Sequence, residues 1–135
     1  MKKIIALISV CLLPVLLGAQ EQKTPEQREK EFYEAVEQQV ERLTTLLDLD
    51  DGQVFYVDSI LTHDYTAMQE EYLTLSQAKV SNADIYYDVQ DKWMERIYNS
   101  IHAVLNETQW DKYLKTGAAR EKKARDKRAA KKLRK

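Results

Sequence analysis

The stretches 49-LDDGQ-53 and 105-LNETQ-109 repeat one pattern, and each opens a new amphipathic run. In both, a leucine precedes a residue whose side-chain oxygen can accept a hydrogen bond from an early helical N–H. A glutamine three residues later can reach back to the capping backbone. Each stretch therefore predicts a helix start next to an apolar leucine. The motif residues are Leu49, Asp50 and Gln53 in the first box, and Leu105, Asn106 and Gln109 in the second.

The pair of boxes resembles the Spy/CpxP family of small periplasmic proteins, whose Leu-Thr-x-x-Gln box occurs twice, each time at a helix start. Asp50 and Asn106 stand here where the family has threonine, and both are good helix caps, so the physical role is kept. The resemblance covers about residues 46–114, and Trp110 and Tyr113 match the aromatic-bearing helix after the family's second box. It implies an ATP-independent chaperone, a homodimer whose helical surface holds unfolded or partly folded envelope proteins until they refold.

Residues 1–20 have the pattern of a cleavable secretory signal. Two lysines precede an apolar run of 14 residues (4–17), and the small Gly18 and Ala19 follow it. A retained membrane anchor is the alternative, but it would need about 20 apolar residues, and the run is shorter and contains Pro14. The pattern predicts export to the periplasm.

The only cysteine, Cys11, lies inside this segment, so the mature chain can use neither a disulfide nor a thiolate. A lipoprotein would require modification of Cys11, but a bulky valine precedes it and the apolar run continues past it. Three Gly and two Pro leave little turn chemistry for a β protein. The composition predicts an all-α fold of three to four long antiparallel amphipathic helices, an elongated hairpin or thin bundle, over residues 21–116.

Apolar residues at helical spacing define the expected helices. The first is expected over residues 24–47, the second from Asp51 through Leu75, the third after a cap at residues 81–84, and the fourth from the second box. No Gly or Pro forces a break near residues 79–82. One continuous helix over residues 51–104, about 80 Å long, therefore stays an alternative.

The apolar faces of the second and third helices are wider than a thin helical array can cover. Either a second subunit or a client protein covers the remainder, or the chain forms a fuller intramolecular bundle. The candidate client or partner surface consists of Tyr65, Met68, Tyr72, Tyr86, Met94 and Tyr98.

Charge divides the chain into an acidic body and a basic tail. Residues 20–114 hold 20 acidic and 8 basic residues, net −12, whereas Lys115 to Lys135 hold 11 basic and 2 acidic residues, net +9. The Ala/Lys/Arg-rich segment 117–135 is helix-prone but has almost nothing to bury, so we expect it to fray. Its first-ranked partner is the acidic body or a second subunit, followed by an anionic membrane surface. Nucleic acid ranks a distant third, because no aromatic residue interleaves the basic run.

Residue patterns for catalysis are missing from this sequence. It has no Gly-rich phosphate loop, nucleophile elbow or Cys–His pair in the mature chain, and His63 and His102 are isolated. We therefore expect no enzyme activity, no catalytic or metal-binding residues and no cofactor. The alternative to a chaperone is an envelope stress sensor or structural protein with one dedicated partner, and breadth of binding discriminates the two.

Overall fold

The computed structural model describes residues 22–135, and the expected signal peptide, residues 1–20, lies outside the described residues. The all-α prediction is confirmed, because the described part is helical and contains no strand. Its elements are α1 (Pro25–Leu47), α2 (Asp51–Gln77), α3 (Ala83–Val104), the short α4 (Glu107–Tyr113), a π-helical turn η1 (Leu114–Ala118) and α5 (Ala119–Lys132). No helix in residues 22–135 is long and apolar enough to cross a membrane.

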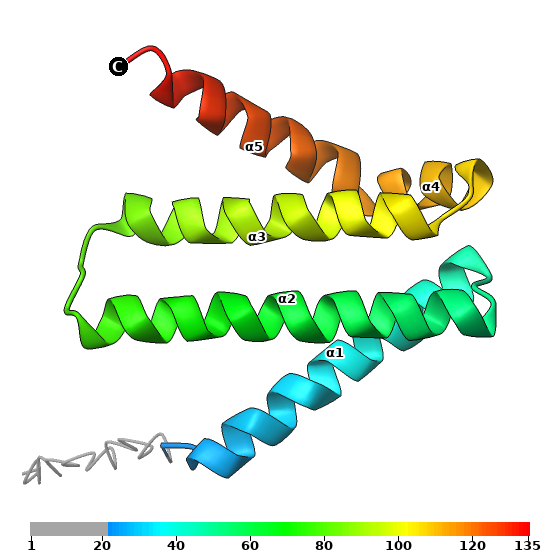
Figure 1. Ribbon diagram of the computed structural model, residues 1–135, viewed down its shortest axis with the longest axis horizontal. Helices are drawn as coiled ribbons and strands as arrows, with labels where there is room; N and C mark the ends of the chain where they lie inside the picture. Colours follow the sequence, from blue (N-terminus) through cyan, green and yellow to red (C-terminus); the bar gives the residue numbers. More distant parts are fainter. Residues whose placement is uncertain (1–21) are drawn as a thin grey trace, which may run out of the picture.

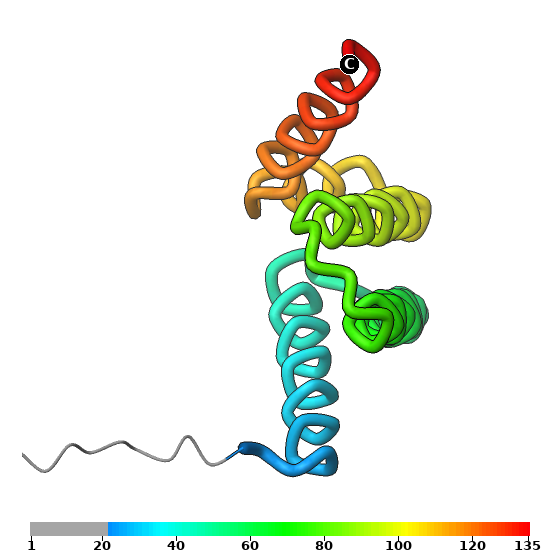
Figure 2. Tube along the Cα trace, turned by 90° about the vertical axis from the view of Figure 1, so that its left-hand side faces the viewer, coloured from blue at the N-terminus to red at the C-terminus, as the bar shows by residue number. Residues whose placement is uncertain are grey.

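Helices α2 and α3 lie side by side as an antiparallel hairpin, which is the long body of the molecule (Figure 1). Helix α1 packs on α2, and α5 packs on α3. Figure 2 shows that α1 and α5 leave the hairpin in opposite directions, so neither helix covers it along its whole length. The predicted elongated hairpin is therefore the architecture, with two helices splayed from it.

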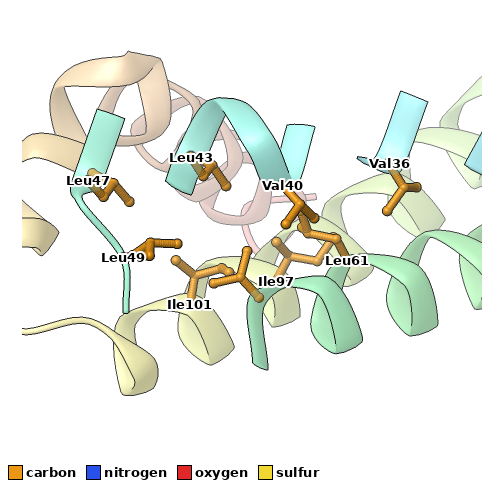
Figure 3. Close-up of a cluster of buried hydrophobic side chains, with 9 residues drawn as sticks. Val36, Val40, Leu43, Leu47, Leu49, Leu61, Ile97 and Ile101 are labelled. Atoms are coloured by element: carbon orange, nitrogen blue, oxygen red, sulfur yellow. The ribbon is translucent and has the colours of Figure 1, made fainter. Parts of the chain in front are cut away.

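The core lies where α1 crosses the hairpin. Val40 and Leu43 of α1 face Leu61 of α2 and Ile97 of α3 (Figure 3). These residues come from the expected apolar rows, which place one side chain toward the hairpin at every turn. The cluster comprises Val36, Val40, Leu43, Leu47, Leu49, Val57, Leu61, Ile97 and Ile101.

An ion pair between the buried Asp64 of α2 and the largely exposed Arg96 ties α2 to α3. Asp64 is only 2% exposed, and its Oδ1 lies 3.3 Å from the Nε of Arg96 on α3. Its neighbour His63, whose side chain is largely exposed, places Nδ1 2.7 Å from the same oxygen. A buried carboxylate requires such partners, because an unpaired charge away from water is strongly destabilising.

The break between α2 and α3 is a defined structure, and the continuous-helix alternative is wrong. Lys79 adopts the left-handed conformation at φ 56°. The N–H of Lys79 donates to the carbonyl of Ser76, and that of Val80 donates to the carbonyl of Leu75. This is the Schellman pattern, which ends a helix by satisfying its last carbonyls. Asn82 then caps α3, as expected, by accepting from the N–H of Asp84 at 3.0 Å.

The basic tail forms helix α5, in agreement with its helix-prone composition, and it packs on α3. Gly117 has φ 108° and breaks the path of the chain between α4 and α5, and its lack of a side chain makes this conformation accessible. The turn directs α5 back along α3 (Figure 1). Ion pairs with α3 hold α5, in agreement with the expected docking of the basic tail on the acidic body.

Candidate functional site

Each of the two boxes forms the predicted helix cap. In the first, Asp50 Oδ1 accepts from the N–H of Gln53 at 2.8 Å, and the N–H of Asp50 donates to Gln53 Oε1 at 3.1 Å. In the second, Asn106 and Gln109 repeat both bonds at 2.9 and 3.0 Å. Two N–H groups at each helix start, which no helical carbonyl can reach, are thereby satisfied.

The two boxes also bind each other through their glutamines, a contact that we call the glutamine clasp (Gln53 and Gln109). Gln53 Nε2 donates to Gln109 Oε1 at 2.7 Å, and Gln109 Nε2 donates to Gln53 Oε1 at 3.0 Å. Each amide also donates to the last carbonyl of another helix. Gln109 reaches Leu47 of α1 at 3.2 Å, and Gln53 reaches Val104 of α3 at 3.1 Å.

The clasp joins four helix ends at one end of the molecule. Gln109 is buried at 7% exposure, Leu49 beside it is buried at 9%, and Leu105 is partly buried against the core. The two caps follow from the sequence pattern, whereas their pairing does not. The glutamine side chain was the signal from which the pairing could have been predicted. A capping glutamine uses its side-chain oxygen in the cap and leaves two N–H donors for other partners.

Three of the six candidate surface residues line one groove. Tyr65 and Met68 of α2 and Met94 of α3 border an open cavity of about 480 Å³, whose other wall is α5. Tyr65 also lines a second cavity of about 340 Å³ between α1 and α2, together with Phe32 of α1. The larger cavity is also lined by charged side chains, among them Asp91, Arg125 and Arg128. We call the two cavities together the apolar track, because Tyr65 borders both.

The other three candidates have intramolecular partners. Tyr72 and Tyr86 stack at a centroid distance of 5.9 Å near the α2–α3 turn, and the Tyr86 hydroxyl donates to the carbonyl of Val80 at 2.8 Å. Tyr98 packs edge-on against Trp110 at 4.9 Å, at the base of α5. The structure therefore separates the six residues into a groove, a turn-end pair and an aromatic cluster.

The aromatic cluster at the base of α5 encloses a buried cation. Arg125 is 7% exposed, and its guanidinium carbon lies 5.5 Å from the centroid of the Tyr98 ring. Among residues 22–135 its Nη2 finds no hydrogen-bond partner, so the ring face supplies part of the missing stabilisation. Burial, with the nearby Tyr65 and Glu121, raises the pKa of Tyr113 to about 12.

A row of ion pairs holds α5 against α3, and we call it the ion-pair ladder. Arg128 donates two hydrogen bonds to Asp91. Its Nε and Nη2 each lie 2.7 Å from a carboxylate oxygen. Partial burial would raise the pKa of Glu95, but hydrogen bonds from Lys122 and Arg125 hold that pKa below its usual value. The ladder pairs Lys122 and Arg125 with Glu95, Arg128 with Asp91, and Lys132 with Asp88.

Acidic and histidine side chains in the described part of the chain form no group of three that could hold a metal ion. The site is thus built from amide, aromatic, thioether and charged groups, whose chemistry suits binding. Comparison of the chain with protein-family models, curated proteins and solved structures finds no significant match.

Proposed function

We propose that this chain is an exported, ATP-independent, chaperone-like protein that binds unfolded or partly folded envelope proteins through the apolar track. The observation that carries the proposal is the track itself. Tyr65 connects the cavity it shares with Met68 and Met94 to the cavity it shares with Phe32. An extended apolar segment of a client can therefore contact α1, α2 and α3 along one path.

The residue types of the track favour binding of varied sequences. Methionine side chains are unbranched and polarizable, so Met68 and Met94 can adapt to different apolar partners. Tyr65 presents an apolar ring with a polar tip, which suits a surface that alternates between water and a client. The resemblance of the two motif boxes to the Spy/CpxP family supports the same proposal.

The direct test is suppression of aggregation by the purified protein without ATP, using two unrelated unfolded clients. We expect protection of both. Met68→Ser removes an apolar wall of the track without touching the core cluster, and it should weaken protection of both clients. Leu73→Ser is the matched control, because Leu73 is an apolar residue of the same helix, is 58% exposed and lies outside the track.

The outcomes separate three interpretations. Loss of protection with Met68→Ser but not with Leu73→Ser supports the track as the client site. Equal loss of protection with both variants would indicate that clients bind to exposed apolar side chains in general. No protection of either client at stoichiometric excess would refute the chaperone proposal and favour an envelope stress sensor or structural protein with one dedicated partner.

A further inference from the structure

Helix α5 carries a second row of basic residues, which the ion-pair ladder does not use. Successive members are three or four positions apart, so they lie along one side of the helix. All four are exposed, and within residues 22–135 none of them takes part in an ion pair. This outer row consists of Arg120, Lys123, Lys127 and Lys131.

We propose that the outer row is a docking surface for an anionic lipid membrane. The proposal is independent of the apolar track and concerns where the protein is held. Clustered Lys and Arg side chains are attracted to a negatively charged leaflet, and the attraction adds up over the cations that reach it.

Because the ion-pair ladder occupies neighbouring carboxylates, these carboxylates do not neutralise the outer row. Asp88, Asp91 and Glu95 of α3 are occupied by the inner cations, whereas Asp84 of α3 borders the same cavity as Lys131, at one end of the row. The acidic Asp126 of α5 itself is bound to Lys122 at 2.7 Å. Exposed charges farther than about 8–10 Å are largely screened at physiological ionic strength, so the acidic body elsewhere does not cancel the row.

The shape of α5 favours a flat anionic surface over nucleic acid. α5 forms an outer edge of the molecule, directed away from the hairpin (Figures 1 and 2). The row runs from residue 120 to residue 131, about 17 Å at the helical rise, so the whole row can meet a plane at once. α5 contains no aromatic residue on which an unpaired base could stack.

The test is co-sedimentation of the full chain with two kinds of vesicle, phosphatidylcholine alone and phosphatidylcholine mixed with phosphatidylglycerol. The apolar N-terminal run is common to all variants and contributes to both vesicle types, so the row is measured as the difference between them. We expect preferential binding to the anionic vesicles that falls steeply with added salt. In the variant R120Q/K123Q/K127Q/K131Q the preference should fall by more than about a hundredfold, at about fivefold per cation.

The matched control is R28Q/K30Q/R42Q/K112Q, which removes four exposed cations of the body and changes the net charge equally. Glutamine is a good helix former, so circular dichroism should show unchanged helix content in both variants. Binding that the control variant retains and the outer-row variant loses supports the proposal. Equal loss in both would overturn it, because net charge alone would then explain binding.

Two further results would also overturn the proposal. One is tighter row-dependent binding to duplex DNA than to anionic vesicles, which would make nucleic acid the partner. The other is a dimer that the outer-row substitutions dissociate, without any preference for anionic vesicles, which would make a second copy the occupant.

Discussion

Gln109 makes more hydrogen bonds than a helix cap requires. It accepts from the N–H of Asn106, as any capping-box glutamine does, and it also exchanges bonds with Gln53 and donates to the carbonyl of Leu47. Its burial means that a lost partner is not replaced by water. The energetic role of this residue is therefore larger than capping.

We expect Gln109→Ala to lower the free energy of unfolding by about 2–4 kcal/mol, because it removes a cap and leaves buried polar groups without partners. Gln27→Ala is the matched control. Gln27 completes the capping box of α1 with Thr24 but is exposed, so its loss should cost only about 0.5–2 kcal/mol. Urea unfolding measures both. Equal costs would show that the clasp contributes nothing beyond capping.

A double-mutant cycle over Gln53 and Gln109 tests the clasp as a unit. The two side chains share two direct hydrogen bonds, so removing both should cost less than the sum of the single substitutions. We expect a coupling energy of about 0.5–3 kcal/mol, the range found for residues in contact. Additive costs in urea unfolding would contradict the pairing.

Tyr113 makes the free energy of unfolding depend on pH in the alkaline range. Its pKa is about 12 in the folded protein, against 10.0 for the ordinary side chain. Below pH 10 the hydroxyl is neutral in both states, so the folded state is not penalised. As pH rises from 10 to 12 the unfolded chain ionises first, and stability falls by about 2–3 kcal/mol. Tyr113→Phe should be less sensitive than the original chain in denaturant unfolding between pH 9 and 11, and equal slopes would contradict this account.

At the scale of elements, α5 differs from α1, α2 and α3 in the interactions that attach it to the rest of the molecule. The other three helices bury apolar rows in the core cluster, whereas α5 buries Arg125 and is attached by the ion-pair ladder. Exposed ion pairs are each worth about 0.2–1 kcal/mol and are screened by salt. α5 is therefore the element most responsive to ionic conditions.

We expect hydrogen exchange of α5 amides to accelerate in about 1 M NaCl, where the Debye length is about 3 Å, while the α2 and α3 amides stay protected. Asp91→Asn, which removes the negative charge and one of the two acceptor oxygens that bind Arg128, should increase opening of α5 about fivefold at low salt. Asp58→Asn is the control, since Asp58 is an exposed acid of α2 outside the ladder. Equal acceleration of α5 amide exchange in Asp91→Asn and Asp58→Asn would show that the ion-pair ladder is not the cause.

The lowered pKa of Glu95 adds a pH dependence of known sign. A carboxylate whose pKa is lower in the folded state stabilises that state above its unfolded pKa, and this stabilisation is lost as pH falls through the folded value. Acidification should therefore release α5 in the same exchange experiment. An α5 more strongly protected in acid would contradict the ladder.

At the scale of the whole molecule, the splayed arrangement leaves apolar side chains in contact with water. A face of this kind is commonly covered by a second subunit. Phe55 and Tyr56 contact each other edge-on at 5.6 Å near the start of α2 and are both exposed. The exposed large apolar residues of the described chain are Tyr33, Leu46, Phe55, Tyr56, Leu73, Ile85, Tyr87 and Leu133.

We expect an elongated homodimer in solution, because pairing two copies would remove part of this surface from water. Light scattering gives the mass, and small-angle scattering gives the shape. A compact monomer at micromolar concentration would contradict the expectation. Replacing Phe55 and Tyr56 by Ser tests whether their patch is part of the contact, with Leu133→Ser as the control at the far end of α5.

The sequence alone determined the helices and their starts. Thr24, Asp50, Asn82 and Asn106 each cap the helix predicted from them, and the apolar rows of α1, α2 and α3 face the core. These features could be predicted because a cap and a helical row depend on residues within a few positions of one another. Local bonds and side-chain periodicity are properties of a short segment.

Only the tertiary structure decided which of these segments meet. Gln53 and Gln109 are 56 residues apart, and their pairing depends on the antiparallel α2/α3 hairpin that brings both boxes to one end. The same folding divided the six surface candidates and decided that α3 is the part of the acidic body on which the basic tail docks. Such contacts depend on which helix faces approach each other, and neither capping nor periodicity contains that information.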